Sequence, residues 1–347
     1  MARDTRSGKA PTSRDVAALA GVAQSTVSYV INGRQVAPET RARVEEAMRK
    51  LRYQPNAGAR TLRTSKTNVI ALVVHLGPED DAVETVPYID TVIAEARRHD
   101  YDVILSTLHE GPEGLIRLAR RSICDGFLLM DVQEYDERVI TASDLDLPVV
   151  LVGRPVEARG LDVVDFDTRK TAHLLVDELA ATGHRHVAVH DEPPGNAGVY
   201  RFLDDFYTGL RERADRHGME LSIIPLEDDS WNSIAQTADP LLDHCHDRLG
   251  IIARTPRITQ SIVQLLQSRG LVPGEDVSLV SRCTDEMATS FPRPLTNVSP
   301  QPRKLTTLAM QFLFDRLAGS EEPARLQLVE PESVTRRATT VNYTRRS

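Results

Sequence analysis

The sequence predicts an α/β protein in which doubly wound layers of parallel sheet and helix follow a small domain of three helices. From residue 68 onward, short apolar runs alternate with helical stretches, the pattern of parallel strands covered by helices on both faces. Between residues 14 and 53, apolar positions instead recur at helical spacing in three short stretches separated by turns. The charge of the chain changes sign near the same boundary.

Start and stop signals define the three N-terminal helices. The first is capped by Thr12 or Ser13 and ends at Gly21, the second runs from about Gln24 to Ile31, and Pro38 opens the third. Their apolar positions are Val16, Ala17, Leu19 and Ala20, then Val27, Val30 and Ile31, then Val44, Ala47, Met48 and Leu51.

The first two of these helices predict a DNA-binding module. Two crossed helices joined by a Gly-containing turn form a shape that fits the major groove of DNA. Since the apolar residues of the second helix face inward, its other face is available to bases. The candidates on that face are Gln24, Ser25, Ser28 and Tyr29.

The charge distribution supports this interpretation. Residues 1–67 contain 13 Lys and Arg against 5 Asp and Glu, a net charge of +8. Because the whole chain carries −8, residues 68–347 carry −16. A basic segment on an acidic body suits a phosphate-binding module. A solvated basic tail is the alternative, but disordered tails lack the alternating apolar faces seen here.

Composition excludes several other classes. No apolar run approaches the length of a membrane span and the N-terminus has no apolar signal core, so we expect a cytoplasmic protein without membrane partners. Cys124, Cys245 and Cys283 are too dispersed for a disulfide framework or a zinc site. We expect them to be small buried side chains.

Enzymatic motifs are also missing. The chain has no G-x-S-x-G elbow, phosphate-cradling Gly loop or His-Glu metal helix. The segment His244-Cys245-His246 is the tightest cluster of potential ligands, but such close neighbours do not readily converge on one metal. We therefore expect no catalytic residues, no metal and no cofactor.

Residues 12–76 resemble the N-terminus of the lactose-repressor (LacI/GalR) family of bacterial transcription regulators. The resemblance extends more weakly over nearly all of the chain. The matching residues are Asp15-Val16-Ala17, Ala20-Gly21-Val22, Thr26-Val27-Ser28, Asn32-Gly33, Val36, Glu39-Thr40-Arg41, Tyr53-Gln54-Pro55-Asn56-Ala57 and Ala59-Arg60-Thr61-Leu62.

The resemblance implies a hinge helix within residues 55–64 that folds only on operator DNA. Leu62 would wedge between base pairs in the minor groove, while Asn56, Ala57 and Arg60 would lie along that groove. A simple interdomain linker is the alternative. The full set of implied DNA contacts is Thr12, Arg14, Gln24, Ser25, Thr26, Ser28, Tyr29, Asn32, Arg34, Asn56, Ala57, Arg60 and Leu62.

Three positions depart from the family pattern. Ala23 replaces a Ser that caps the second helix, at a cost of about 1 kcal/mol. Tyr29 replaces an Arg that reaches guanine in many relatives, so the operator should differ at that base pair. Gly58 should cost the hinge helix about 1 kcal/mol of helix propensity.

The body of the chain is predicted from its apolar runs. Expected strands are Val69–Val74, Val103–Ser106, Gly126–Met130, Val149–Val152, Val187–Val189, Gly250–Ala253 and Val277–Val280, and expected helices include Tyr88–His99, Thr168–Thr182, Phe206–His217 and Thr259–Arg269.

The resemblance implies that this body is periplasmic-binding-protein-like, with two lobes joined by crossings near Asp167, Pro300 and Pro331. The expected domains are a disordered tail (1–11), a helix-turn-helix domain (12–55), a hinge (56–66) and an effector-binding and dimerisation domain (67–347). Within the last, lobe 1 covers about 68–167 and 300–330, and lobe 2 about 168–299 and 331–347.

A ligand would bind between the lobes, at the carboxyl ends of the strands. Three polar positions that grip sugars in relatives are altered together here, and Arg254 stands at one of them. Converging arginines would suit an anionic sugar derivative, whereas a degenerate cleft would bind nothing. The candidate effector-binding residues are Tyr88, Arg154, Asp167, Arg201, Phe202, Trp231, Arg254 and Asp285.

The sequence thus predicts a transcriptional regulator, most simply a repressor, that binds a palindromic operator as a homodimer under the control of a sugar-like or anionic sugar-derived effector. The rival hypothesis is a cytosolic small-molecule binding protein whose basic N-terminal segment has no DNA role.

Overall fold

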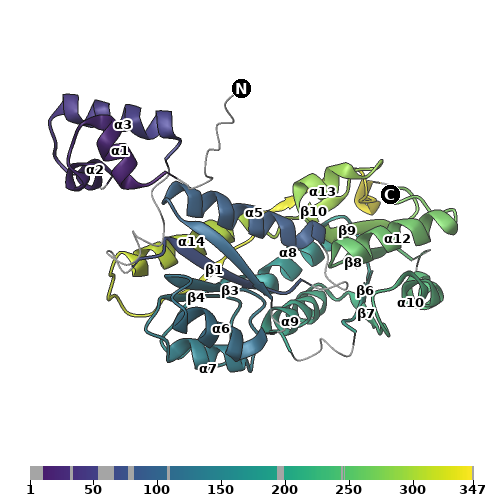
Figure 1. The fold of residues 1–347 in the computed structure, drawn as a ribbon. Coiled ribbons are helices and arrows are strands. Elements are labelled where there is room, and N and C mark those ends of the chain that lie inside the picture. The colour runs from purple at the N-terminus through teal and green to yellow at the C-terminus, as the bar shows by residue number, and fades with distance from the viewer. Residues whose placement is uncertain are drawn as a thin grey trace. The chain divides into compact units, whose positions relative to one another are not determined.

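The computed structural model describes residues 11–31, 34–53, 66–76, 82–107, 110–193, 199–243, 245 and 247–345. The chain forms two compact units, unit 1 (Met1–Thr67) and unit 2 (Asn68–Ser347) (Figure 1). Among the described residues, no helix combines the length and apolar character needed to cross a membrane.

Unit 1 contains the three expected helices: α1 (Ser13–Ala20), α2 (Gln24–Ile31) and α3 (Pro38–Leu51). They surround a small apolar core. Its buried members are Val16, Ala17, Ala20, Val27, Val30, Val44 and Ala47, and Ile31, Met48 and Leu51 pack against them partly buried. Leu19 differs from expectation, since 51% of its surface is exposed on the outer side of α1.

Local side-chain chemistry fixes where α1 begins and ends. Thr12, rather than Ser13, is the N-cap, and it forms a capping box with Asp15: the Thr12 hydroxyl accepts from the Asp15 N–H while the Asp15 carboxylate accepts from the Thr12 N–H at 2.7 Å. Gly21 ends the helix with φ 63°, a left-handed conformation that favours glycine.

Unit 2 contains two six-stranded sheets, which define lobe 1 and lobe 2. The strand order is β11-β5-β4-β3-β1-β2 in lobe 1 and β12-β10-β9-β8-β6-β7 in lobe 2, and only β12 runs antiparallel to its neighbour. The strands are β1 (Val69–Val74), β2 (Asp102–Thr107), β3 (Gly126–Leu129), β4 (Val149–Val152), β5 (Asp162–Phe166), β6 (His186–His190), β7 (Glu220–Ile224), β8 (Leu249–Ala253), β9 (Ser278–Arg282), β10 (Thr296–Val298), β11 (Leu326–Val329) and β12 (Val334–Thr335).

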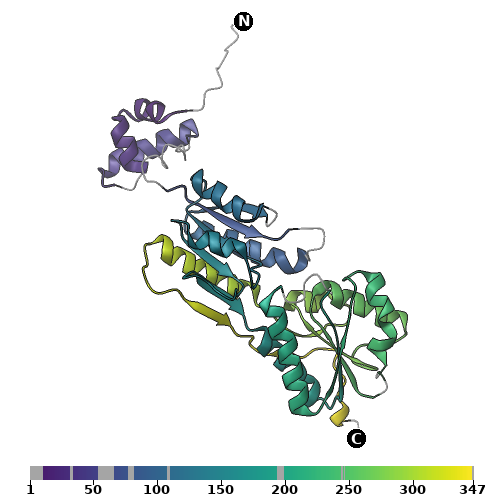
Figure 2. The same ribbon diagram turned by 90° about the horizontal axis from the view of Figure 1, so that it is seen from below.

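Helices cover both faces of each sheet, as Figure 2 shows for lobe 2. This arrangement explains the uninterrupted apolar run of β1, because Ile70 and Leu72 pack into one core layer and Ala71 and Val73 into the other. The helices are α5 (Ala82–Arg98), α6 (Gly111–Arg120), α7 (Glu137–Ser143), α8 (Thr168–Ala181), α9 (Arg201–His217), α10 (Trp231–Gln236), α11 (Ala238–Leu242), α12 (Pro256–Ser268), α13 (Asp285–Ser290) and α14 (Pro302–Leu317), with a 3₁₀ turn at Tyr343–Arg345.

The chain passes between the two sheets three times. It leaves lobe 1 after β5 and enters α8 of lobe 2, returns from β10 to α14, and leaves again between β11 and β12. The crossings therefore lie at Asp167, between Val298 and Pro302, and between Val329 and Val334. Both sheets direct the carboxyl ends of their parallel strands toward these crossings.

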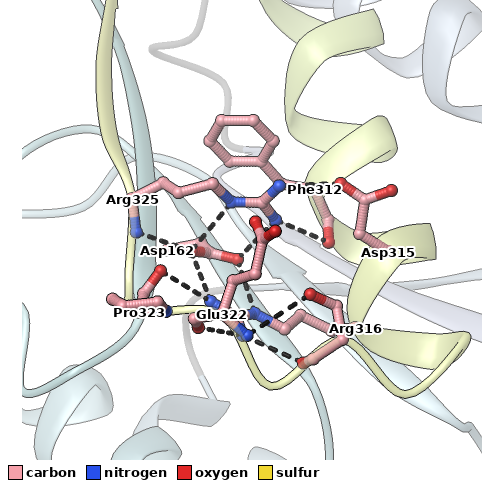
Figure 3. Close-up of polar contacts among 8 residues, drawn as sticks. Asp162, Phe312, Asp315, Arg316, Glu322, Pro323 and Arg325 are labelled. Atoms are coloured by element: carbon pink, nitrogen blue, oxygen red, sulfur yellow. Dashed lines mark hydrogen bonds and ion pairs between the residues drawn. The ribbon is translucent and has the colours of Figure 1, made fainter.

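A buried carboxylate of lobe 1 joins β5 to two segments that follow more than 150 residues later in the sequence (Figure 3). The side chain of Asp162, at the start of β5, is completely buried and accepts hydrogen bonds from Arg316 (2.8 and 2.9 Å) and from the backbone and guanidinium of Arg325 (2.8 and 2.9 Å). The Arg325 guanidinium also lies 3.7 Å from the centre of the Phe312 ring. The cluster ties the end of α14 and the start of β11 to β5.

The predicted α/β fold class is confirmed, but not every element was expected. The expected strands coincide with β1, β2, β3, β4, β6, β8 and β9 to within two residues. Strands β5, β7, β10, β11 and β12 were not predicted, and α5 begins at Ala82, six residues before the expected start at Tyr88.

Candidate DNA-binding surface and effector cleft

Helix α2 presents a polar face to solvent. Val27 and Val30 are buried in the core of unit 1, whereas Gln24, Ser25 and Tyr29 are exposed. Two further predicted contacts, Thr26 and Ser28, are half-buried. The exposed residues recur one helical turn apart, so α2 has the outward face required of a helix that enters a DNA groove.

Neighbouring residues position the side chains on this face. The Gln24 amide donates to the Ser13 hydroxyl at 2.8 Å, and the guanidinium of Arg34 lies 5.5 Å from the centre of the Tyr29 ring. The backbone of Arg34 is held in turn by Arg41, whose guanidinium donates to its carbonyl at 2.9 Å. Tyr29 is therefore an exposed ring accompanied by a cation.

Two other predicted DNA contacts have different settings. Thr12 caps α1 with its hydroxyl, so a structural role accounts for its side chain. Arg14 is exposed in the first turn of α1. The remaining predicted contacts, Asn32, Asn56, Ala57, Arg60 and Leu62, lie outside the described residues.

The candidate effector residues of unit 2 follow the carboxyl ends of strands in both lobes. Arg154 follows β4 and Arg254 follows β8, and Tyr88 lies on α5, which follows β1. In parallel α/β sheets this edge is where ligands bind, and contacts of Arg154 with Asp205 and of Arg282 with Glu84 join the two lobes here. We refer to the space between these strand ends as the cleft.

Carboxylates neutralise the arginines of the cleft. Arg154 pairs with Asp205 of α9 and lies 3.9 Å from Asp165 of β5. Arg254 pairs with Glu192, which follows β6, and both side chains are at least 90% buried. The charges of these two arginines are therefore balanced within the cleft by neighbouring carboxylates.

Arg282, at the end of β9, links the two lobes. Its guanidinium lies 2.6 Å from the Glu84 carboxylate of α5 and 3.4 Å from the Arg254 carbonyl. Burial alone would lower the pKa of Arg282, but Glu84, Tyr88 and Cys283 together more than offset burial and the pKa is raised. The charge of Arg282 is thus firmly retained.

Two further groups complete the electrostatics of the cleft. Burial raises the pKa of the Asp165 carboxyl to about 6, although the Phe166 N–H and Arg154 oppose the shift. Burial likewise raises the pKa of Tyr88, which Arg282 partly offsets. Because both Arg282 and Asp165 influence Tyr88, these groups share one environment.

The cleft contains buried polar atoms whose hydrogen bonds are not all satisfied. Among the described residues, the Nε atoms of Arg154 and Arg254 have no hydrogen-bond partner, and neither has Oδ2 of Asp165. Buried polar groups normally find partners, and those at a binding site find them in the ligand. Nε of Arg154 and Oδ2 of Asp165 lie 3.9 Å apart, an ion pair too long for a hydrogen bond, so these atoms retain hydrogen-bonding capacity.

The other predicted effector residues are used differently. Asp167 caps α8 and accepts from the Lys170 N–H at 2.8 Å, and Asp285 pairs with Arg337 at 2.8 Å. Arg201 and Phe202 begin α9. Trp231 begins α10 with 43% of its surface exposed. Arg154 and Arg254 form ion pairs in the cleft, and Tyr88 lies where Arg282 and Asp165 affect its pKa. Among the described contacts, the other five candidates form no ion pair with these residues.

Sequence reasoning missed the carboxylates of the network. Glu84, Asp165, Glu192, Asp205 and their partner Arg282 were not among the candidates. Three of them lie within two residues of a strand's carboxyl end. That position is the signal that could have identified them.

A separate cavity of about 510 Å³ lies along β7 of lobe 2, lined by Ser222, Glu227 and Thr237 among others. None of the candidate effector residues lines it. Within the described part of the chain, no group of three or more His, Cys, Asp and Glu side chains is arranged to hold a metal ion. Cys124 and Cys283 are buried, and Cys245 is partly exposed.

Comparison with known proteins identifies both units. Residues 12–56 match the family described as bacterial regulatory proteins, lacI family, and residues 176–340 match the periplasmic binding protein-like domain. The chain is 32% identical over 332 residues to the HTH-type transcriptional regulator CelR of Thermobifida fusca, covering 92% of this chain and 95% of CelR. It is 26% identical to the transcriptional repressor PurR of Vibrio atlanticus, covering 94% and 97%.

Solved structures agree with this assignment. A lac repressor dimer bound to operator and the anti-inducer ONPF matches with a TM-score of 0.79 at 21% identity, covering 96% of this chain and 100% of that one. A complex of CelR with cellobiose matches with a TM-score of 0.66 at 26% identity, covering 95% and 99%. The relatives are transcriptional regulators rather than enzymes, so the chain belongs to the lacI family of DNA-binding transcriptional regulators.

Proposed function

We propose that this protein is a repressor that binds a palindromic operator as a homodimer, with α2 of each protomer in the major groove. The observation that carries the proposal is the outward face of α2, where Gln24, Ser25 and Tyr29 are exposed opposite the buried Val27 and Val30. Side chains on such a face reach base edges, while the net charge of +8 on residues 1–67 supplies phosphate contacts.

The hinge of this proposal comprises residues 56–66. Asn56, Ala57 and Arg60 lie along the minor groove and Leu62 separates a central base step. The family assignment supports these roles. Replacing Leu62 with Ala should weaken operator binding and reduce the bend of the DNA, which circular permutation of the operator fragment would measure.

The homodimer is proposed to form along the open edge of lobe 1. Strand β2 is the last strand of its sheet, and α5 packs beside it. The two elements expose Leu105, Val83 and Val86, which are 46%, 49% and 55% exposed. An exposed apolar sheet edge of this kind is a favourable surface for association with a second protomer. Leu105→Glu should therefore produce monomers in analytical ultracentrifugation, while Ile140→Glu on α7 should leave the dimer intact.

For the effector we propose a neutral, sugar-like ligand in the cleft rather than an anionic derivative. Arg154 and Arg254 are already paired with carboxylates, and their Nε atoms together with Oδ2 of Asp165 offer hydrogen bonds without surplus charge. A hydroxyl group both donates and accepts, so a polyol satisfies all three atoms. The cellobiose bound to CelR supports a ligand of this class.

Fluorescence anisotropy with fragments of the protein's own promoter tests DNA binding. Arg14→Gln should weaken binding to all sequences and reduce the salt dependence by about one charge, whereas Gln24→Ala should cost about 1–3 kcal/mol and relax selectivity at one base pair. Arg120→Gln, which removes an exposed charge from α6 of lobe 1, is the matched control. Failure of the wild type to bind at low salt would contradict the proposal.

Calorimetry with neutral and phosphorylated sugars tests the effector. Neutral disaccharides should bind, and Asp165→Asn should weaken them because the acceptor is changed. Tighter binding of the phosphorylated sugars to the wild-type protein would contradict a neutral ligand.

A further inference from the structure

Besides an exposed contact of 4.0 Å between Arg303 of α14 and Glu286 of α13, two partly buried ion pairs connect lobe 1 to lobe 2 in the described part of the chain. One joins Glu84 of α5 to Arg282 of β9 at 2.6 Å, and the other joins Arg154, which follows β4, to Asp205 of α9. In each pair, one residue belongs to each lobe. We call them the cross-lobe pairs.

The cross-lobe pairs are partly shielded from water. The side chains of Arg282 and Glu84 are 9% and 27% exposed, and those of Arg154 and Asp205 are 21% and 27% exposed. By comparison, Arg169 and Glu212, which pair within lobe 2, are 48% and 43% exposed. Because solvent and salt screen shielded pairs less, the cross-lobe pairs attract more strongly than this surface pair.

A backbone contact accompanies the cross-lobe pairs. The N–H of Glu134, which follows β3 in lobe 1, donates to the carbonyl of Val199, which precedes α9 in lobe 2, at 2.9 Å. This hydrogen bond exists only while the two lobes are together, since its donor and acceptor belong to different sheets. It is therefore a direct reporter of lobe closure.

We propose that the cross-lobe pairs are an electrostatic latch that holds the lobes closed over the cleft. The proposal deepens the function proposed above, since it concerns the regulation of the same cleft and rests on that function for its biological meaning. Closure then does not require the effector to bridge the lobes. A ligand changes the balance between the closed and open arrangements of the lobes only if it binds one of them more tightly. An effector that hydrogen-bonds Arg154 or Arg282 in place of its carboxylate partner therefore favours the open arrangement.

The latch is separable from the folding of each lobe. None of the four side chains belongs to the apolar cores of the sheets. Neutralising Glu84 or Asp205, the more exposed member of each pair, removes the attraction and leaves the cores unchanged. A purely structural role would instead destabilise the lobes themselves.

Amide hydrogen exchange with single-residue resolution on the full chain tests the latch. The variants are Glu84→Gln, Asp205→Asn and the double variant, and Glu212→Gln is the matched control. Each single variant should reduce protection of the Glu134 amide by about tenfold, the order expected for one interaction between contacting groups, and the double variant should reduce it further. Protection of Leu128, in the sheet of lobe 1, should not change.

Two results would overturn the latch. The first is a Glu134 amide that is equally protected in the double variant and the wild type, because other contacts would then hold the lobes. The second is a loss of protection at Leu128 that equals the loss at Glu134, because the pairs would then stabilise the lobe as a whole. The measurement uses neither DNA nor a sugar, so its outcome is independent of whether the proposed function holds.

Discussion

Replacing Asp162 with Asn tests whether a buried carboxylate organises lobe 1. The carboxylate accepts from both Arg316 and Arg325 and is the only acidic group that these two arginines share among the described contacts (Figure 3). Asn keeps the shape but removes the charge. The two guanidinium groups then remain close together without the anion between them.

The magnitude follows from the pKa of the carboxyl group. Burial would raise it, but hydrogen bonds from Arg316 and Arg325 outweigh burial and lower the pKa of Asp162 from 3.8 to about 2. This difference corresponds to about 2.5 kcal/mol of stability at neutral pH. The Arg316 and Arg325 guanidinium groups, mostly buried, would also lose their shared anion. Asp162→Asn should therefore cost about 3 kcal/mol and lower the melting temperature by about 6–12 °C.

Urea unfolding followed by circular dichroism between pH 7 and pH 3 is the assay. Because the folded pKa lies below the unfolded value, the stabilisation is present above about pH 4 and is lost as the pH falls toward 2. About half of the 2.5 kcal/mol should be gone at pH 3, so the difference between wild type and variant should narrow there. Asp315→Asn, which removes only one contact of Arg325, should cost less than about 1 kcal/mol. A difference that is small at pH 7, or that does not change with pH, would refute the reasoning.

Four further outcomes are expected. Thr12→Ala should lower the stability of unit 1 by about 1 kcal/mol in thermal unfolding, and Thr12→Ser should restore it, because the capping box needs a hydroxyl. Gly209→Ala should lower the free energy of unfolding, although alanine favours a helix over glycine by about 1 kcal/mol, because the new Cβ would lie 2.6 Å from the Arg169 carbonyl oxygen. A variant more stable than the wild type in urea would contradict this packing. Asp165→Asn should stabilise the protein above pH 6 but not at pH 4, because the folded pKa of about 6 exceeds the ordinary 3.8 and ionisation costs stability as pH rises; equal effects at both pH values would argue against a buried carboxylate. Tyr29→Arg should favour guanine at one operator position in selection from random sequences, and unchanged selectivity would exclude Tyr29 from base reading.

The N-terminal unit was the most predictable part of the chain because its signals are local. Residues 24–31 form α2 with the expected bounds, and Pro38 and Gly21 begin and end helices as expected. The choice between Thr12 and Ser13 as cap needed geometry, since both have a hydroxyl. The exposure of Leu19 also needed the structure, because an apolar residue on a short helix does not reveal which face is covered.

The strands that were missed are those whose burial depends on distant partners. Strand β5 begins with Asp162, whose charge argues against burial. Its partners Arg316 and Arg325 lie more than 150 positions later in the sequence and contact it only in the folded chain. Strand β10 is buried although two of its three residues are polar. Its Asn297 amide donates to the Cys283 carbonyl at 2.8 Å. Hydrophobic periodicity cannot detect burial of this kind.

The charge partners of the cleft residues could not be predicted from the sequence either. From sequence, an anionic sugar derivative was one hypothesis for the effector, because Arg154, Arg201 and Arg254 could be assigned to the cleft while the carboxylate partners of Arg154 and Arg254 could not. Asp205 reaches Arg154 from the other lobe, and Glu192 reaches Arg254 from a neighbouring strand, so each charge is matched only after folding. What remains for a ligand is the unmatched hydrogen-bonding capacity of buried atoms. These partners come from strand ends that lie far apart in the sequence, and a residue-by-residue comparison with relatives cannot identify them.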